Sequence, residues 1–275
     1  MTGLQLKWLL TGLLGGMGCG LAGFILVSLN LPFMGICLAH AALAGAVLAY
    51  FIGTPVLGTA LVASLVTAVL IGPISDRTRT HANTIMSILF SLTLGLAFLG
   101  IGILQNRRSE VLSLMWGNLL LVQWADLLPL TAAALLPLVL LFVFGKEMKA
   151  VLFDREIARA SGIHATALYY AMITLCGFTV TVNLNIVGGL MLYSLLTNPA
   201  VAALQLARGY KAVVIWSMSL GALAALGGLI VSFFFNWPAG ASIVLVSSLI
   251  YAASLAARAI RSSRSGESLP LGDSP

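Results

Sequence analysis

The chain has 275 residues, of which 60% are hydrophobic and only 8% are charged. Soluble globular domains carry about 25% charged residues, so this composition excludes a soluble globular domain and indicates an integral membrane protein. The apolar runs have the length of spanning helices, about 20 residues, and not the ten-residue alternation of barrel strands. The net charge of +6 does not indicate a nucleic-acid partner, because the basic residues lie between the apolar runs.

The apolar runs predict an all-α fold, a polytopic membrane helical bundle of about eight or nine transmembrane helices. Eight is the count if one run does not cross. The first run has glycines at a spacing of four, which favours close helix packing. The predicted spans are 8–29, 34–52, 55–75, 83–104, 127–144, 164–183, 185–205, 212–235 and 239–257.

Segments outside these runs complete the predicted organisation. Residues 110–127 carry Trp116, Trp124 and Asp126, which is typical of an interfacial or re-entrant helix. We expect one transmembrane domain over 1–260, with a cytoplasmic segment at about 146–164. The polar stretch 261–275 is expected to be a disordered cytoplasmic tail.

The basic residues predict the orientation of the chain. If the loop SDRTRTH at 75–81 is cytoplasmic, eleven of the Lys and Arg residues fall on the cytoplasmic side and three on the other. This bias follows the positive-inside rule. With nine spans, the N-terminus is outside and the C-terminus is cytoplasmic.

One imidazole lies in the second predicted span. His40 is the only conventionally ionisable side chain well inside a predicted span. Polar groups are costly there and tend to line pathways, so a role in translocation is favoured over a satisfied core histidine. His81 and His164 lie in or beside loops and are expected to be solvated. The three cysteines are interpreted first as small core residues.

The longest cytoplasmic loop, FGKEMKAVLFDREIARASGIHA, has mixed charge and predicts a short helix. Asp154 and Glu156 stand early, as the helix dipole favours, and Gly162 can end the helix. The composition fits either a solvated connecting helix or a docking helix that transmits force from a partner ATPase. The chain has no GxxxxGK[ST] loop, so it does not bind ATP by that route.

Several segments resemble, in chain order, the ABC-3 family of permeases for zinc, manganese and iron uptake. The family's L-F-G-D-x-L-x-V-x-x-x-D-L segment is similar to LMWGNLLLVQWADL at 114–127. Its signature span is similar to IVGGLMLYSLLTNPAVAALQLAR at 186–208, and its P-A-G-x-S turn to WPAGASIVL at 237–245. The coupling segment of ABC-type importers is similar to LFDREIARASGI.

The resemblance implies the permease subunit of an ABC importer for divalent transition metals, in a prokaryotic cytoplasmic membrane. Such a chain is not an enzyme, since ATP is hydrolysed on a separate cytoplasmic ATPase subunit. The implied partners are that ATPase, an extracytoplasmic solute-binding protein and a second copy of the permease. The implied ATPase-coupling residues are Asp154, Arg155, Glu156, Ala158, Arg159 and Gly162.

The second span resembles the family pattern F-x-G-D-x-L-x-H-x-x-L-x-G, with one departure. His40 matches the histidine, which the resemblance implicates in a transient metal site, but the aspartate falls on Ile36. Cys37 could offer a thiolate, and imidazole with thiolate would favour zinc over manganese. Further candidates for the translocation path are Asn185, Asn198 and Pro199, with Asn198 expected to satisfy backbone groups freed at the proline.

Three other functions stay open at this point. A related permease could carry a chelated metal or an organic substrate, which the loss of the aspartate favours slightly. A secondary transporter driven by an ion gradient would need buried carboxylates, and the predicted spans contain none. A membrane scaffold without transport would need neither His40 nor the charged loop.

Overall fold

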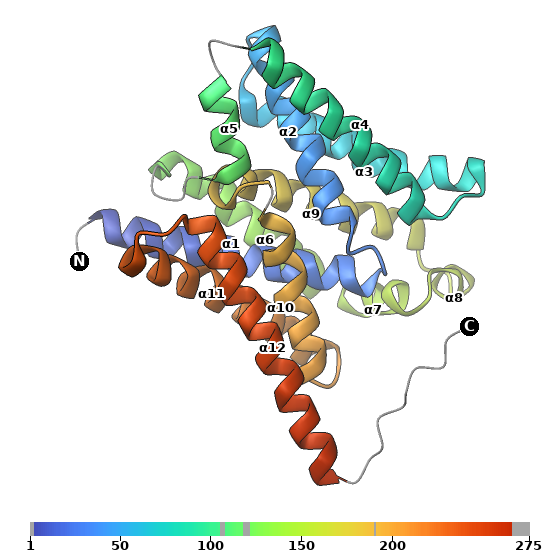
Figure 1. The fold of residues 1–275 in the computed structure, drawn as a ribbon. Coiled ribbons are helices and arrows are strands. Elements are labelled where there is room, and N and C mark those ends of the chain that lie inside the picture. The colour runs from blue at the N-terminus through green and yellow to red at the C-terminus, as the bar shows by residue number, and fades with distance from the viewer. Residues whose placement is uncertain (1–2, 105–107, 118–121, 190, 266–275) are drawn as a thin grey trace.

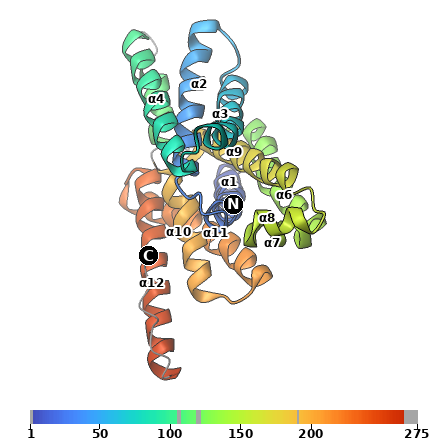
Figure 2. The ribbon, with the colours of Figure 1, turned by 90° about the vertical axis from the view of Figure 1, so that its right-hand side faces the viewer.

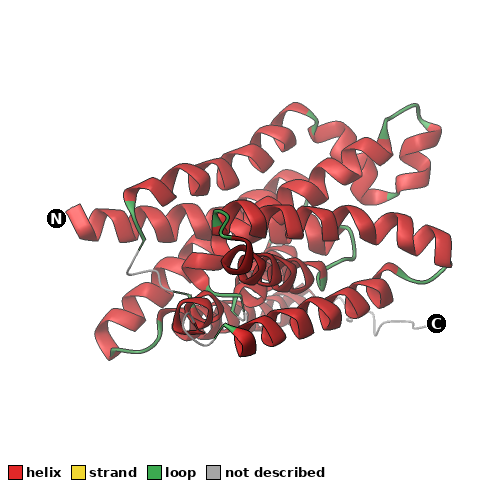
Figure 3. Ribbon diagram, turned by 90° about the horizontal axis from the view of Figure 1, so that it is seen from above, coloured by secondary structure: helices red, strands yellow, loops and turns green. Residues whose placement is uncertain are grey.

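The computed structural model describes residues 3–104, 108–117, 122–189 and 191–265, and this part of the chain contains helices and no strand (Figure 3). The predicted all-α class is therefore confirmed. The helices are α1 (Gly3–Ser28), α2 (Met34–Ile52), α3 (Val56–Thr78), α4 (Ala82–Ile103), α5 (Arg108–Trp116), η3 (Trp124–Asp126), α6 (Leu127–Val143), α7 (Gly145–Phe153), α8 (Arg155–Ala160), α9 (Ala165–Val187), α10 (Leu192–Leu206), α11 (Tyr210–Phe235) and α12 (Ala239–Ser265).

Within the described residues, eight segments are long and apolar enough to cross a membrane. The expected span at 185–205 corresponds to α10, which has only 15 residues. It is short because α9 continues to Val187 and ends where Gly188 takes a φ of +92°. These eight candidates agree with the prediction of about eight or nine transmembrane helices, and α10, the remaining predicted run, is shorter than the other eight.

The expected single helix at 110–127 is wrong in detail. α5 ends at Trp116, Gly117 takes a φ of +73°, and a separate one-turn helix, η3, follows at Trp124–Asp126. A residue with positive φ does not continue a right-handed helix, so Gly117 divides the segment. Residues 118–121 lie outside the described part of the chain.

Two groups of helices lie on either side of α1 and α9 (Figures 1 and 2). One group contains α2, α3 and α4, and the other contains α10, α11 and α12. α1 packs against α11, α10, α6 and α9, so it forms the centre of the bundle. α12 extends beyond its neighbours (Figure 2) and runs to Ser265, past the predicted start of the tail; residues 266–275 are not among those described.

The glycines of α1 allow this central packing, as the spacing of four predicted. A Cβ at Gly16 would lie 2.4 Å from the carbonyl oxygen of Gly221 in α11, and one at Gly20 would lie 2.2 Å from that of Ser217. A Cβ at Gly23 would lie 1.8 Å from the carbonyl oxygen of Leu196 in α10. Helix backbones can approach this closely only where one of them has no side chain.

A few charged side chains fall inside the candidate spans, contrary to the expectation that all lie outside. They are Lys7, Asp126, Lys211, Arg258 and Arg261, in helices that extend further than the predicted spans. All five are within a few residues of a span end, where the four long basic side chains can reach the interface. His40 differs from them because it lies in the interior of the span Met34–Ile52.

Candidate substrate path and coupling segment

His40 lies on α2 and is buried within the bundle. Its side chain is 2% exposed, and its Nδ1 lies 2.9 Å from the carbonyl oxygen of Ile36 one turn earlier. A carbonyl oxygen only accepts, so Nδ1 carries the proton and donates it to Ile36. The lone pair of the neutral ring is then on Nε2, which is the arrangement found in metal-binding histidines anchored through their other nitrogen.

The hydrogen bond that anchors His40 is accepted by the backbone carbonyl of residue 36, and the side chain of residue 36 takes no part in it. Because this anchor is a backbone group of α2, it is available whether residue 36 is isoleucine or aspartate. The replacement noted in the sequence therefore removes a carboxylate without removing the support of His40.

Cys37 lies on α2 three residues before His40 and is fully buried as a free thiol. A spacing of three places the two side chains on nearly the same face of the helix. Across the described residues, no group of three or more His, Cys, Asp or Glu side chains is placed to hold a metal ion. One copy of the chain thus supplies at most two such donors at this position.

Ring contacts link His40 to α4. The imidazole meets the ring of Phe90 edge to face, with centroids 4.8 Å apart and planes at 77°. Phe90 also meets Phe33 edge to face, at 5.6 Å and 72°. Sequence reasoning missed Phe90, because a phenylalanine in an apolar helix carries no signal that separates this contact from ordinary core packing or lipid exposure.

A second polar group in the membrane-spanning region lies between α10 and α12. The amide nitrogen of Asn198 donates to the hydroxyl of Ser194 at 2.7 Å and to those of Ser247 and Ser248 at 3.1 Å each. The amide donor of Asn198 was expected to satisfy backbone groups freed at Pro199, and this expectation is wrong, because the donor is bound to one serine hydroxyl of α10 and two of α12. Pro199 itself is buried in α10.

The other predicted path residue, Asn185, lies in α9, but its side chain is outside the described residues. Asn183, two residues earlier, is fully buried. Its Nδ2 donates to the carbonyl of Thr179 at 2.8 Å, and its Oδ1 has no hydrogen-bond partner in the described structure. A Cβ at Gly15 of α1 would lie 2.7 Å from this oxygen, so the amide fits closely against a glycine.

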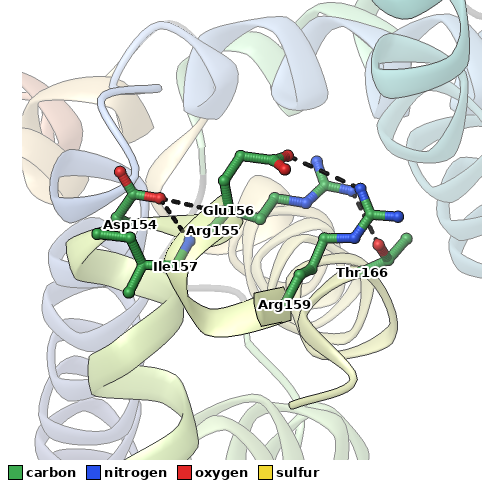
Figure 4. Close-up of polar contacts among 6 residues, drawn as sticks. All are labelled: Asp154, Arg155, Glu156, Ile157, Arg159 and Thr166. Atoms are coloured by element: carbon green, nitrogen blue, oxygen red, sulfur yellow. Dashed lines mark hydrogen bonds and ion pairs between the residues drawn. The ribbon is translucent and has the colours of Figure 1, made fainter. Parts of the chain in front are cut away.

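The charged loop forms two short helices, where one was expected. α7 ends at Phe153, and Asp154 then caps α8: its Oδ1 accepts hydrogen bonds from the backbone N–H groups of Glu156 at 2.8 Å and Ile157 at 2.9 Å (Figure 4). This is the usual role of an aspartate at a helix start. Gly162 follows the end of α8 with a φ of +80°, which confirms the predicted stop.

Arg155 ties this segment to the long helix α9. Its guanidinium donates to the Thr166 hydroxyl at 3.3 Å (Figure 4). It also lies 4.5 Å from the centre of the Tyr169 ring. Glu156 and Arg159 form an exposed ion pair at 3.7 Å, a type that contributes little stability. Ala158 is buried, so α8 has an inner face against the bundle and an outer face that carries Ile157 at 58% exposure.

A cavity of about 640 Å³ separates α7 and α8, the helices of the predicted coupling segment (called the coupling helices below), from the ends of α1, α10 and α11. Phe24 and Ser28 of α1, Lys149 and Phe153 of α7, and Tyr210 of α11 are among its lining residues. The cavity places α7 and α8 at the end of the bundle where α1 ends and α2 begins.

Three of the family-like segments meet at one backbone junction, which we call the glycine junction (Gly117, Gly188 and Gly240). A Cβ at Gly117 would lie 2.3 Å from the carbonyl carbon of Val187, and one at Gly188 would lie 2.5 Å from that of Trp116. A Cβ at Gly240 would lie 2.9 Å from the carbonyl oxygen of Val187. The junction joins α5, the α9–α10 connection and the start of α12.

The eight candidate spans, the polar groups on α2 and α10 and the absence of strands in the described chain define a polytopic integral membrane protein of the transporter class. A family model described as the ABC 3 transport family matches residues 2–258. The chain belongs to this family, and it is the permease subunit of an ABC transporter and not itself an enzyme.

Relatives and a solved structure cover nearly all of the chain. The high-affinity zinc uptake system membrane protein ZnuB of Haemophilus influenzae is 27% identical over 90% of this chain and 95% of its own length. The manganese transport system membrane protein MntC of Halalkalibacterium halodurans is 27% identical over 89% of this chain and 84% of its own. The structure of PsaBC from Streptococcus pneumoniae in complex with Fab has a TM-score of 0.83 at 26% identity and covers 92% of this chain and 91% of that one.

Proposed function

We propose that this chain is the membrane-spanning permease of an ATP-driven importer for divalent transition metal ions, namely zinc, manganese or iron. Family membership and relatives named for zinc uptake and manganese transport support this substrate class. Two copies of the permease would associate with a cytoplasmic ATPase and receive metal from an extracytoplasmic binding protein. The membrane would be a prokaryotic cytoplasmic membrane, with the C-terminus and the residue 146–164 segment on the cytoplasmic side.

The observation that carries the proposal is the buried imidazole of His40 with its Nδ1–H bound to the Ile36 carbonyl. An imidazole inside a span is costly, so it is usually retained for a function, and this tautomer leaves Nε2 able to bind a metal. His81 and His164 lie outside the candidate spans, so His40 is the one histidine placed for this role.

The site would bind its substrate weakly. His40 and Cys37 supply one nitrogen and one sulfur donor, and water or a second copy of the chain would complete the coordination. Transport requires release as well as binding, so an incomplete site suits a translocation path. A nitrogen and sulfur pair favours zinc over manganese, which prefers oxygen ligands. Asn185, Asn198 and Pro199 would contribute to the polar wall of the same path.

The segment α7–α8 would transmit movement of the ATPase to the bundle. Asp154 starts α8, and Arg155 connects it to α9 through Thr166 and Tyr169, so a displacement of α8 would act on a membrane helix directly. Phe153 at 86% exposure and Ile157 at 58% give the outer face apolar groups for the partner. Glu156, Ala158, Arg159 and Gly162 would keep this segment helical, packed and terminated.

A permease for a chelated metal is the second candidate. The observation that favours it is Ile36, since a chelated ion would not need the missing carboxylate. The same coupling and the same partners would apply, and only the path would differ.

Uptake measurements test the proposal. Cells that lack their own zinc and manganese importers would carry the complete system, and entry of radioactive zinc and manganese would be followed with the free ions and with the same ions presented as stable chelates. We expect entry of a free ion that requires the permease and disappears when the ATPase partner is replaced by a variant unable to hydrolyse ATP. Entry of the chelates alone would contradict the proposal and favour the second candidate.

A further inference from the structure

We propose that Phe90 of α4 is a cover that closes His40 on the side of the coupling helices, and that its displacement frees the imidazole for release of the substrate metal. This inference rests on the proposed role of His40 in the path. It assigns a function to a residue that no motif in the sequence singles out.

Burial of His40 depends in part on the Phe90 ring. The imidazole is 2% exposed, while Phe90, which meets it edge to face at 4.8 Å, is only half-buried. Phe90 therefore lies between His40 and the outside of the α2–α4 pair. A hydrocarbon ring does not ligate a metal ion, and it excludes the water that a hydrated ion would bring.

The cover lies on a definite side of His40. Phe33, the second contact of Phe90, precedes His40 by seven residues, which is about 10 Å along a helix axis at 1.5 Å per residue. That direction leads to the beginning of α2 and the end of α1, where Phe24 and Ser28 line a cavity together with α7 and α8. The Phe33–Phe90 pair thus separates His40 from the end of the bundle that carries the coupling helices.

α4 also provides a polar route from the cover to that end. Asn83, Ser87 and Ser91 are exposed and lie four residues apart, so they form one row on the helix that passes Phe90. The Ser87 and Ser91 hydroxyls each donate to a carbonyl one turn earlier, at 2.9 Å, and their oxygens remain able to accept. A displaced Phe90 would open His40 onto this row.

α4 is suited to such a movement. Only 33% of the apolar stretch of α4 is buried, against 67% for α2. The contacts of α4 with the rest of the bundle are mainly with α2 and α3. A small shift of α4, or a rotation of the Phe90 ring, would uncover His40 while α2 stays in place.

Chemical labelling of the three histidines tests the cover. Diethyl pyrocarbonate acylates accessible neutral imidazoles, and mass spectrometry of the purified permease–ATPase complex reports each histidine separately. His81 and His164 are exposed and serve as internal standards. We expect His40 to stay unlabelled in the wild type and its labelling rate to rise by about tenfold or more in Phe90→Ala, as for a site that loses protection by local structure.

Two variants and a folding control accompany this measurement. Phe98→Ala removes the same side chain from an exposed position of α4 and should leave His40 protected. Phe90→Leu keeps most of the apolar volume and should give intermediate labelling. The thiols of Cys19 and Cys176 are buried, so their continued resistance to a maleimide reports that each variant is folded.

The outcome separates this inference from the proposed function. Equal protection of His40 in folded Phe90→Ala and in the wild type would overturn the cover, whatever the uptake data show. If Phe90→Ala proves unfolded by the thiol test, Phe90→Leu decides, and wild-type protection there would overturn the cover. Exposure of His40 in Phe90→Ala together with normal metal uptake by His40→Ala would support the cover and contradict the role of His40 in the path.

Discussion

The glycine junction and the His40 site both correspond to family-like motifs, but this chain matches them differently. At the junction, Gly117, Gly188 and Gly240 all agree with the family pattern. On α2 the histidine agrees, and the aspartate four residues before it is replaced by Ile36. The junction is built from backbone, where any Cβ would overlap a neighbouring chain, whereas the site is built from side chains.

The difference between the glycine junction and the His40 site shows which substitutions the fold can tolerate. At the junction, a single methyl group would collide with backbone atoms 2.3 to 2.9 Å away. On α2, the carbonyl of residue 36 anchors His40 whatever its side chain is, so the aspartate can be lost and the fold kept. Backbone contacts at the glycine junction therefore restrict substitution, whereas a side chain of the proposed path at residue 36 can change.

The largest expected effect comes from a methyl group at the junction. Gly188→Ala combines a φ of +92° with a Cβ 2.5 Å from the carbonyl carbon of Trp116. Left-handed strain costs about 1–2 kcal/mol and overpacking about 1–3 kcal/mol, so we expect a loss of about 2–5 kcal/mol or failure to fold. Thermal unfolding in detergent, followed by reaction of the buried cysteines with a fluorogenic maleimide, measures this loss.

The matched control for the junction is Gly53→Ala. Gly53 has a φ of +77° and nothing within 4 Å of its ideal Cβ, so it isolates the conformational cost at about 1–2 kcal/mol. Equal destabilisation by Gly53→Ala and Gly188→Ala would show that close backbone approach contributes nothing at the junction.

At the His40 site, Cys37→Ala tests whether the Cys37 thiol binds the metal. If Cys37 is a ligand, its loss should lower zinc uptake by about tenfold, at the lower end of what changes around metal sites cost, and leave folding intact. Cys19→Ala is the matched control, because Cys19 is equally buried but lies on α1. The same zinc uptake rate in both variants would reduce Cys37 to a packing residue.

Restoring the family aspartate sharpens the comparison further. Ile36 is half-buried, so the Ile36→Asp carboxylate can stay partly hydrated while lying one turn from His40. An oxygen donor favours manganese, and we expect the ratio of manganese to zinc uptake to rise about fivefold. Ile36→Asn has the same shape without the charge and should shift the ratio less; a shift of the same size would exclude the carboxylate as its cause.

The smallest expected effect is at the coupling segment. Asp154→Ala removes two cap hydrogen bonds and should destabilise α8 by about 1 kcal/mol, while Asp154→Asn retains a capping oxygen. We expect the alanine variant alone to lower metal uptake per ATP hydrolysed, by about twofold, in a reconstituted transporter. An unchanged ratio in Asp154→Ala would mean that α8 does not depend on its cap for coupling.

Much of this architecture could be predicted from apolar length and helical spacing. The all-α bundle, the glycine face of α1 and the position of His40 inside a span follow from local sequence alone. The break between α9 and α10 could not be predicted, because it depends on Gly188 packing against Trp116, a residue 72 positions earlier in the chain.

The site could be predicted only in part for a similar reason. The imidazole is visible as a polar residue in an apolar run, but its cover, Phe90, looks like any other apolar residue of α4. Two of the three hydroxyl partners of Asn198 come from α12, about 50 residues later, so the sequence around Pro199 gives no indication of them. Both the Phe90–His40 contact and the α12 partners of Asn198 depend on contacts between segments that are distant in the sequence.

The most direct test of the central claim, that His40 lies on the metal path, is zinc uptake by the complete transporter with His40→Ala. His81→Ala, at an exposed histidine, is the matched control, and ATPase activity of the assembled complex verifies that each variant is folded and assembled. We predict that His40→Ala lowers zinc entry by about tenfold or more and that His81→Ala leaves it unchanged. Wild-type zinc entry in His40→Ala would contradict the claim.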